Sequence, residues 1–368
     1  YFTGGIAKSS AGVYAMIFLV SLGLALFKNG AIIGRVITDK SQMDPAFSMR
    51  YTLVNVGAFI GTFLVGILYK DVFAKDGVLG FAPCFKMAAL MMVLGGLWYI
   101  FVCWRFLGDL GKLPFKKTLD RPILPRSSID KTLTEEEKAE EAKKKEETGT
   151  KQPLTTIEKK RIGAIFVASL FSIVFWIFWY LGYMPVYFYW AENMDWVVAG
   201  YQVPSTWFDA ANSLFCVILG PVTAALWKKL AARPQGDMSL FRKTGLGIAI
   251  IGVGYLFYAA IDIMRGGEKA SVLWLIVFAF LLTMGEMFFS PLGHSFISKY
   301  SPSRYLAVMM SVWGFATFIA AKSYGPVYGL LFGGKIEFKV ACIGVAVVSF
   351  AAALIMIALD KKLSALVD

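Results

Sequence analysis

The sequence predicts an all-α integral membrane protein, a bundle of long apolar helices. Its composition is the first observation: 57% of the 368 residues are apolar and 17% are charged, with a mean hydropathy of +0.62. Soluble domains carry about 25% charged residues. The second observation is a series of nine apolar stretches, each near the ~20 residues that a helix needs to cross a bilayer. The third is that the basic residues gather in the segments between these stretches. Together they exclude an ordinary soluble enzyme.

The nine predicted spans fall into two groups. We place them at residues 12–34, 47–69, 85–107, 162–190, 207–230, 243–263, 272–298, 305–332 and 336–359. One long hydrophilic stretch, 108–161, separates three spans from six and contains a run of mixed charge with high helix propensity. We therefore expect a partial amino-terminal bundle (1–107), a charged linker (108–161) and a carboxy-terminal six-helix bundle (162–368).

The net charge of +12 is explained by membrane topology rather than by nucleic acid. Lysine and arginine collect in 35–50, 112–161, 228–243, 299–304 and 361–362, whereas 181–206 has none. The positive-inside rule then places the linker and the carboxyl terminus in the cytoplasm, with the chain integral to the plasma (inner) membrane. The four cysteines show neither disulfide nor metal spacing. We expect no cofactor, no metal and no obligatory protein partner, with lipid as the surrounding medium.

This topology puts residue 1 outside the membrane, and no signal peptide precedes it. We expect three further spans upstream, which gives six spans, a cytoplasmic linker and six more. That plan belongs to the major facilitator superfamily, whose substrate site lies between the halves near the midplane. We expect the nine spans alone not to transport.

Three ionisable residues fall deep inside predicted spans: Lys28, Glu286 and Lys322. Such residues usually face a cavity or a partner, so each is a functional candidate. Ser290 follows Glu286 by one helical turn, and Pro291 favours a kink beside them. A carboxylate there would bind an amine or hold a proton, or would form a structural pair with a neighbouring helix.

Other polar and aromatic residues receive simpler explanations. Asp209, Asp262, Arg35 and Arg105 lie near span ends, where contact with the interface suffices. The single histidine, His294, is interpreted as a packed residue rather than a proton relay. The tryptophans and tyrosines of 179–196 are interpreted as an interfacial aromatic belt.

Four sequence blocks resemble the proton-dependent oligopeptide transporter family. They are GLALFKN (23–29), FSMRYTLVNVG (47–57), NSLFCVILGPVTAALW (212–227), and GEMFFSPLG (285–293) followed by SPSR (301–304), Trp313 and IAAKSYG (319–325). They are similar to the family's fourth, fifth, eighth, tenth and eleventh helices, in that order. The second block, with the pattern F-S-x-x-Y-x-x-x-N-x-G, is the most specific.

The resemblance implies proton-coupled uptake of di- and tripeptides. Lys28 would hold the peptide carboxylate, and Asn212 and Glu286 the peptide amino terminus, with Glu286 the candidate for proton coupling. Four further residues would line the cavity: Tyr51, Asn55, Ser290 and Trp313. Lys322 would lie towards the outside, where a gating contact fits better than a substrate contact.

The sequence departs from the family pattern in two places. The family's first-helix E-x-x-E-R cluster is not in this sequence, and Tyr180 stands where the seventh-helix pattern F-W-x-x-F-E-Q has its acid. The coupling path or the cargo therefore remains open. The alternatives are a carrier of the same fold for nitrate, an amino-acid conjugate or another small anion or zwitterion, and a non-transporting membrane receptor. A membrane-embedded enzyme is disfavoured because one histidine supplies no catalytic cluster.

Overall fold

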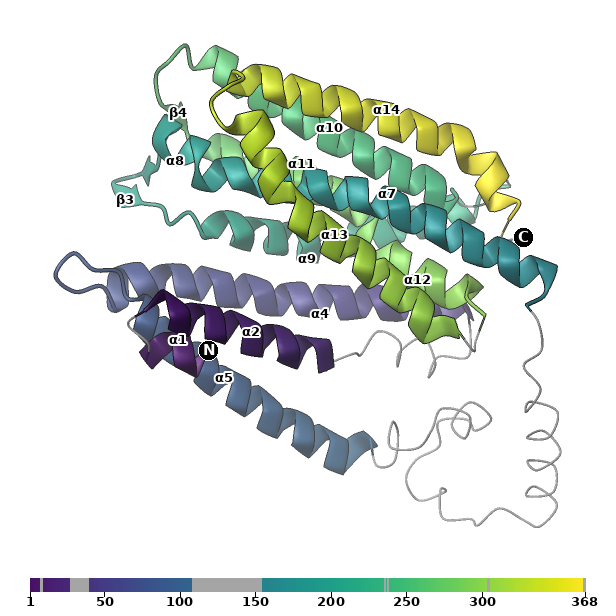
Figure 1. The fold of residues 1–368 in the computed structure, drawn as a ribbon, viewed down its shortest axis with the longest axis horizontal. Coiled ribbons are helices and arrows are strands. Elements are labelled where there is room, and N and C mark those ends of the chain that lie inside the picture. Colours follow the sequence, from purple (N-terminus) through teal and green to yellow (C-terminus); the bar gives the residue numbers. More distant parts are fainter. Residues whose placement is uncertain are drawn as a thin grey trace.

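The structure, a computed structural model, describes residues 1–6, 9–26, 40–107, 154–234, 236, 238–302 and 305–366. Long helices dominate it (Figure 1). The amino-terminal part contains α1 (Phe2–Ile6), α2 (Ser10–Leu26), α4 (Lys40–Ile67) and α5 (Phe81–Val102), and the π-helical turns η1 (Leu68–Val72) and η2 (Cys103–Leu107) extend α4 and α5. The carboxy-terminal part contains α7 (Thr156–Tyr187), α8 (Tyr189–Asn193), α9 (Trp207–Ala231), α10 (Leu240–Met264), α11 (Leu273–Met287), α12 (Ser290–Tyr300), α13 (Leu306–Phe332) and α14 (Phe338–Ser364).

The predicted membrane bundle is confirmed. In the described part of the chain, eight helices are long and apolar enough to cross a membrane, and they match eight predicted spans within about seven residues at either end. The ninth prediction, 12–34, begins in α2, and its residues 27–34 lie outside the described part. Most of the predicted linker, 108–153, also lies outside it. Helix α7 begins at Thr156, so the last residues of the predicted linker belong to this helix.

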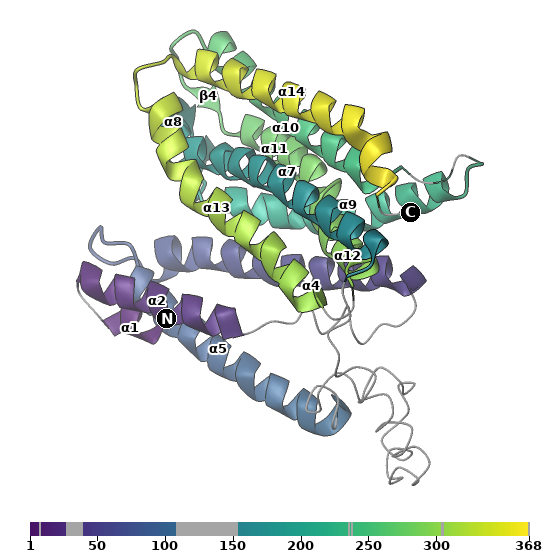
Figure 2. The same ribbon diagram turned by 45° about the vertical axis from the view of Figure 1, so that its right-hand side comes forward.

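Two layers of helices meet at α4. The pairs α10–α14, α7–α13 and α4–α9 pack along each other. In both views α4 lies between the carboxy-terminal helices and the group formed by α1, α2 and α5 (Figures 1 and 2). Among the described residues, helix α4 is therefore the main element of the amino-terminal part that contacts the other half, chiefly through α9 and α12.

Local sequence explains where the carboxy-terminal helices begin. Thr155 precedes α7 and forms a capping box with Glu158: the Glu158 amide donates to Thr155 Oγ1 at 3.3 Å, and the Thr155 amide donates to Glu158 Oε2 at 2.9 Å. Ser239 caps α10 by accepting from the amide of Arg242 at 3.1 Å. These side chains satisfy amides that have no partner inside the helix.

The predicted seventh span is interrupted. Helix α11 ends at Met287 and α12 begins at Ser290, with Phe289 between them at φ −127° and ψ −58°. Pro291, in the first turn of α12, has no amide hydrogen and is suited to begin a helix rather than to continue one. The argument that Glu286 and Ser290 share one helical face assumed an unbroken helix, and the break corrects it.

The buried aromatic residues of the carboxy-terminal half correct the predicted interfacial belt. Trp190 is fully buried, and its ring packs edge-on against Phe338 and at a tilt against Tyr258. The Tyr258 ring in turn stacks on Phe278. Tryptophan has enough apolar surface to serve as core when neighbouring helices cover it. The belt prediction is therefore wrong for Trp190, because composition alone does not show what covers a ring.

A small hairpin marks one end of the bundle. Strands β2 (Val197–Val198) and β3 (Tyr201–Gln202) pair antiparallel, and their turn places Ala199 and Gly200 at φ of 50° and 80°. Beside them, β1 (Met194–Asp195) pairs parallel with β4 (Ala270–Ser271) and ties the hairpin to α11. The start of α7 and the end of α14 lie at the other end (Figure 1). The hairpin end is thus the one that the charge pattern assigns to the outside.

Candidate functional site

The buried carboxylate of Glu286, in the last turn of α11, is the centre of the candidate site. Its side chain is 5% exposed. The preceding residue, Gly285, packs against α10 so closely that a Cβ there would lie 2.8 Å from the carbonyl oxygen of Gly247. Because only glycine permits this approach, α11 lies directly on α10. Glu286 finds its partners on three other helices.

Three side chains donate hydrogen bonds to this carboxylate. The Tyr51 hydroxyl of α4 donates to Oε1. Trp179 of α7 and Asn212 of α9 each donate to Oε2, at 3.1 Å. Tyr51 belongs to the amino-terminal half and the other two belong to the carboxy-terminal half, so the site joins both halves of the molecule.

Two further polar groups complete the cluster. Asn212 also donates to Thr283 Oγ1 at 2.8 Å, which fixes its amide between two acceptors. The Sγ atom of Cys216 lies 3.9 Å from Glu286 Oε2 and 3.7 Å from the Tyr51 hydroxyl. Asn212 and Cys216 stand four residues apart, on one face of α9. That spacing was the available signal for Cys216, which the sequence analysis missed together with Thr283.

Glu286 has no basic partner in the part of the chain that the structure describes: none of the ion pairs between described residues includes it. A buried carboxylate held only by neutral donors retains a strong attraction for a cation or a proton. The cluster is therefore suited to receive an ammonium group or a proton, which are the two roles expected from the sequence.

Three other predicted site residues are buried but have different partners. Asn55 donates to the backbone oxygen of Tyr51 at 2.9 Å, within its own helix. Ser290 is buried at the start of α12. Trp313 of α13 is buried, and its ring stacks on Phe289 at 5.1 Å between centroids. Ser290 and Trp313 thus lie at the break between α11 and α12, whereas Asn55 lies one turn from Tyr51 on α4.

The two predicted lysines have different outcomes. Lys28 lies outside the described residues, so its predicted place opposite Glu286 stays a prediction. Lys322 is exposed on α13. Its predicted gating contact also stays a prediction.

Aromatic rings form one wall beside Glu286. Trp179, which the sequence analysis assigned to the interfacial belt, donates to the carboxylate, so that assignment is wrong for it as well. Its ring lies 4.5 Å from that of Tyr183. Tyr180, at the position of the family acid, stacks on Tyr324 of α13 at 5.1 Å. The sequence does not distinguish these rings from surface aromatic residues. The packing of α7 against α9 and α11 in the structure does.

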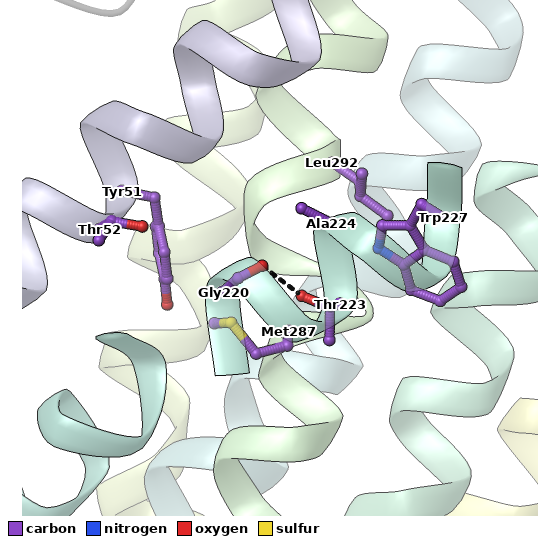
Figure 3. A pocket seen from close by; sticks show the side chains of 8 residues that line it. All are labelled: Tyr51, Thr52, Gly220, Thr223, Ala224, Trp227, Met287 and Leu292. Atoms are coloured by element: carbon purple, nitrogen blue, oxygen red, sulfur yellow. Dashed lines mark hydrogen bonds between the residues drawn. The ribbon is translucent and has the colours of Figure 1, made fainter. Parts of the chain in front are cut away.

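A small pocket lies beside the cluster, between α4 and α9 (Figure 3). Its lining consists of Tyr51, Thr52, Gly220, Thr223, Ala224, Trp227, Met287 and Leu292. The hydroxyl of Thr223 donates to the Gly220 oxygen at 3.1 Å. A Cβ on Gly220 would approach Thr52 Oγ1 to 3.2 Å, so glycine keeps the two helices close here. Tyr51 separates this pocket from the Glu286 carboxylate.

The two halves also meet at the hairpin end. Tyr201 of β3 donates to Asp71 Oδ2 at 2.7 Å, and this hydrogen bond raises the pKa of the Tyr201 hydroxyl. Lys70 donates to the backbone oxygen of Gln202, and its ammonium lies 4.1 Å from the Tyr201 ring centroid.

Next to this contact, the Trp207 ring stacks on Phe63 at 4.8 Å. The hairpin and the start of α9 thus close one end of the bundle against the end of α4.

The fold and the site define a multi-pass helical membrane protein with a buried polar cluster between its two halves, an arrangement found in transporters rather than in enzymes. The sequence matches the POT family over residues 6–332. The chain belongs to this family.

Among curated proteins, an uncharacterized transporter, YclF of Bacillus subtilis, is 26% identical over 346 residues, which covers 86% of this chain and 67% of that protein. A di-/tripeptide transporter of Lactococcus lactis subsp. cremoris is 28% identical over 170 residues, covering 45% of this chain and 33% of that protein. The chain thus spans between one third and two thirds of the length of these relatives.

A solved structure of a POT family transporter in complex with 5-aminolevulinic acid superimposes with a TM-score of 0.76. It is 21% identical in sequence, and the match covers 98% of this chain and 79% of that one. At this identity the likeness shows the fold, which agrees with the predicted major facilitator bundle.

Proposed function

We propose that the protein is a secondary active transporter that carries di- and tripeptides into the cell together with protons. The observation that carries this proposal is the buried Glu286 carboxylate, held by neutral donors from both halves of the bundle. Membership of the POT family and the similarity to a di-/tripeptide transporter support the cargo.

The proposed binding mode fixes the two charged ends of a peptide. Glu286 and Asn212 hold the amino terminus, and Lys28 holds the carboxylate from the opposite half. Tyr51, Asn55, Ser290 and Trp313 line the cavity between them. Because only the ends are fixed, side chains of different size are tolerated. Lys322 acts in gating.

The proposed coupling ion is the proton, with Glu286 as a site that binds it. A carboxyl group that carries a proton offers no negative charge to an ammonium group, so proton binding and peptide binding at Glu286 are linked. No cofactor or metal is required. In the described part of the chain, no group of three or more histidine, cysteine, aspartate or glutamate side chains is arranged to hold a metal ion.

We propose that residues 1–107 and 162–368 form the two moving halves and that 108–161 is a cytoplasmic linker. Small peptides and membrane lipid are the partners, with no nucleic acid and no obligatory protein. The carboxyl terminus is placed in the cytoplasm by the charge pattern of the loops.

A second candidate cargo is a small zwitterion or anion that is not a peptide. Tyr180 favours this alternative, because its ring stacks on Tyr324 where the family pattern has an acid. A site that recognises two charged ends also accepts other molecules with an ammonium and a carboxylate at similar separation. Among the described residues, no feature favours the receptor alternative, and most of the charged linker on which that alternative depends lies outside them.

Uptake by proteoliposomes tests the proposal. The full-length protein is reconstituted, and accumulation of a labelled dipeptide is measured with and without an inward proton gradient, with protein-free liposomes as the control. We expect accumulation only with the gradient. Uptake that ignores the gradient refutes coupling, and no uptake under either condition refutes the cargo. Competition by unlabelled nitrate or 5-aminolevulinic acid then separates the alternatives.

A further inference from the structure

A second carboxylate, Asp209, lies near Glu286 on the side of the hairpin. We propose that Asp209 is an external proton-binding site that delivers protons to Glu286. This inference rests on the proposed proton-coupled function and adds to it a residue that the sequence analysis had explained by interfacial contact. Four observations carry it: the place of Asp209 on α9, its hydrogen bond, the residues that adjoin the two carboxyl groups, and the identity of residue 180.

Asp209 stands on the same face of α9 as the residues that contact Glu286. Asn212 and Cys216 follow it by three and seven residues, spacings that share one helical face. Three residues correspond to about 4.5 Å along the helix axis. The Asp209 carboxylate is therefore about one turn closer to the hairpin end than Asn212, which donates to Glu286.

The hydrogen bond of Asp209 comes from a neutral donor. The Tyr187 hydroxyl of α7 donates to its Oδ2 atom. None of the ion pairs between described residues involves Asp209. Like Glu286, Asp209 has no basic partner in the described part of the chain. Unlike Glu286, it is partly exposed, and it lies towards the end of the bundle that the charge pattern assigns to the outside.

Tyr183 packs against residues that adjoin the two carboxyl groups. Its ring lies 4.5 Å from that of Trp179, which donates to Glu286, and 5.0 Å from that of Phe208, the neighbour of Asp209. Tyr183 lies within electrostatic range of both Glu286 and Asp209. Its hydroxyl can donate and accept at once, as a proton path requires.

Several other titratable side chains on the helices around α9 contact groups other than Asp209. On the α4 side, Tyr51 donates to Glu286, and Lys70 and Asp71 contact each other and β3. The ring of Tyr69, in η1, stacks on Phe81 at 4.8 Å between centroids. The titratable group of α11 is Glu286 itself.

Residue 180 bears on the role of Asp209, because this sequence has a tyrosine where the family pattern has an acid. In the family pattern the seventh helix supplies an acid there, whereas Tyr180 stacks on Tyr324. Tyr180 and Tyr187 lie seven residues apart on one face of α7. The contact between Tyr187 and Asp209 therefore places a carboxylate two turns further out along the same face.

The proposed step moves one proton and leaves every other group unchanged. The Asp209 carboxylate takes a proton from external water and becomes a neutral acid. When it passes a proton inwards, it returns to the carboxylate, and the Glu286 carboxylate gains that proton. One positive charge has then moved from outside to the centre of the site.

The test compares Asp209→Asn with Tyr187→Phe in the full-length protein. In Asp209→Asn, the asparagine side chain still accepts the hydrogen bond from Tyr187 but cannot take up a proton. In Tyr187→Phe, that hydrogen bond is lost and the Asp209 carboxylate remains. We expect Asp209→Asn to lower gradient-driven dipeptide accumulation about tenfold or more. It should leave dipeptide counterflow without a gradient within about twofold, since exchange needs no net proton movement. Tyr187→Phe should retain driven accumulation, and Asp209→Glu should restore it.

Two results overturn the inference. One is wild-type accumulation by Asp209→Asn. The other is equal loss by Asp209→Asn and Tyr187→Phe in both assays, which shows that the contact only ties α7 to α9. Size-exclusion profiles identify a variant that has failed to fold. If Asp209→Asn fails to fold, driven accumulation by Asp209→Glu decides between the inference and its rejection. Glu192→Gln, at an exposed acid of α8, controls for surface charge. Absence of any driven uptake by the wild-type protein overturns the proposed function instead.

Discussion

The hydroxyl of Tyr51 donates a hydrogen bond to the carboxylate of Glu286, although 235 residues separate them and they belong to different halves of the bundle. The contact places a group from each half at one carboxylate. In a transporter that works by moving its halves against each other, such a contact must change during every cycle. Protonation or ligand binding at Glu286 is then coupled directly to the relative position of the halves.

Glu286→Gln tests the carboxylate itself. Glutamine keeps the size of the side chain but has no charge for the peptide amino terminus, so a charge-assisted hydrogen bond of about 1.5–3 kcal/mol is lost. We expect dipeptide affinity to fall by about 10- to 100-fold. Calorimetry or competition binding on the purified variant measures this affinity. Wild-type affinity would show that Glu286 is not a ligand group.

Lys28→Ala tests the opposite end of the proposed cargo. Removing the ammonium group leaves the peptide carboxylate without its proposed partner, and we expect a loss of affinity of similar size, about 10- to 100-fold. An N-terminally free peptide amide, which has no carboxylate to lose, should bind Lys28→Ala and wild type equally. Lys229→Ala, at an exposed lysine in the last turn of α9, serves as the control. Equal loss for peptide and peptide amide would remove Lys28 from the site.

Tyr51→Phe tests the link between the halves. The ring remains, but Glu286 Oε1 loses its donor, and we expect dipeptide affinity to fall about tenfold because the carboxylate is no longer oriented. Thiol labelling of Cys216, whose Sγ lies 3.7 Å from the Tyr51 hydroxyl, should accelerate as the halves separate more easily. Tyr14→Phe, at an exposed tyrosine of α2, is the matched control. Unchanged affinity together with unchanged labelling would contradict the role.

A disulfide between positions 66 and 206 tests movement at the hairpin end. A Cβ on Gly66 would lie 2.9 Å from Thr206 Oγ1. In a disulfide a Cβ atom lies about 3 Å from the partner sulfur, as follows from an S–S bond of ~2.05 Å. We expect oxidised Gly66→Cys/Thr206→Cys to stop dipeptide uptake and reductant to restore it.

The single variants under oxidant are the controls for this cross-link. Full uptake by the cross-linked protein would mean that this end of α4 and α9 stays together throughout the cycle. Opening of the two halves at this contact during transport would then be excluded.

Arg265→Gln tests a contact that holds α8 to α10. Arg265 donates to Asp262 at 2.7 Å and to the Tyr189 hydroxyl at 2.7 Å, with 14% and 10% of the two charged side chains exposed. Burial alone lowers the pKa of Arg265, but the hydrogen bonds to Asp262 and Tyr189 outweigh it and raise the pKa. We expect a loss of about 3 kcal/mol in the free energy of unfolding, because Asp262 is left enclosed without its cation.

This loss should not depend on pH in the usual working range. A raised arginine pKa contributes stability at every pH below the ordinary value and loses it only above that value, so results at about pH 5 and pH 9 should agree. Thermal unfolding in detergent measures the loss of stability at each pH. Lys339→Gln, at an exposed pair with Glu337, should leave stability unchanged. An equally small effect of Arg265→Gln would show that water already screens its ion pair.

Much of the architecture was predictable because a bilayer restricts the chain strongly. Apolar runs of spanning length form helices, since backbone groups in lipid must bond within their own segment. The predicted span 207–230 corresponds to α9, Trp207–Ala231, and 305–332 to α13, Leu306–Phe332. The break at Phe288 and Phe289 was only suggested by Pro291, because proline permits either a kink or a new helix start.

The candidate site was predictable in part. Glu286 stood out because an acid inside an apolar span is costly, and Tyr51 and Asn212 through the family resemblance. Trp179 and Trp190 were misassigned because an aromatic ring has the same sequence signal at a membrane interface and in a core. Cys216 and Thr283 carry no charge, so nothing in the sequence required a partner for them.

The sequence by itself determined that this protein is a bundle of membrane helices with a charge pattern that orients it, because both properties depend on residues close together in the chain. Only the tertiary structure decided that Tyr51, Trp179 and Asn212 converge on Glu286, and that Asp209 lies one turn further out against Tyr187. Such convergence depends on how helices distant in sequence pack. Close approaches at glycines such as Gly285 set that packing, which no local pattern encodes.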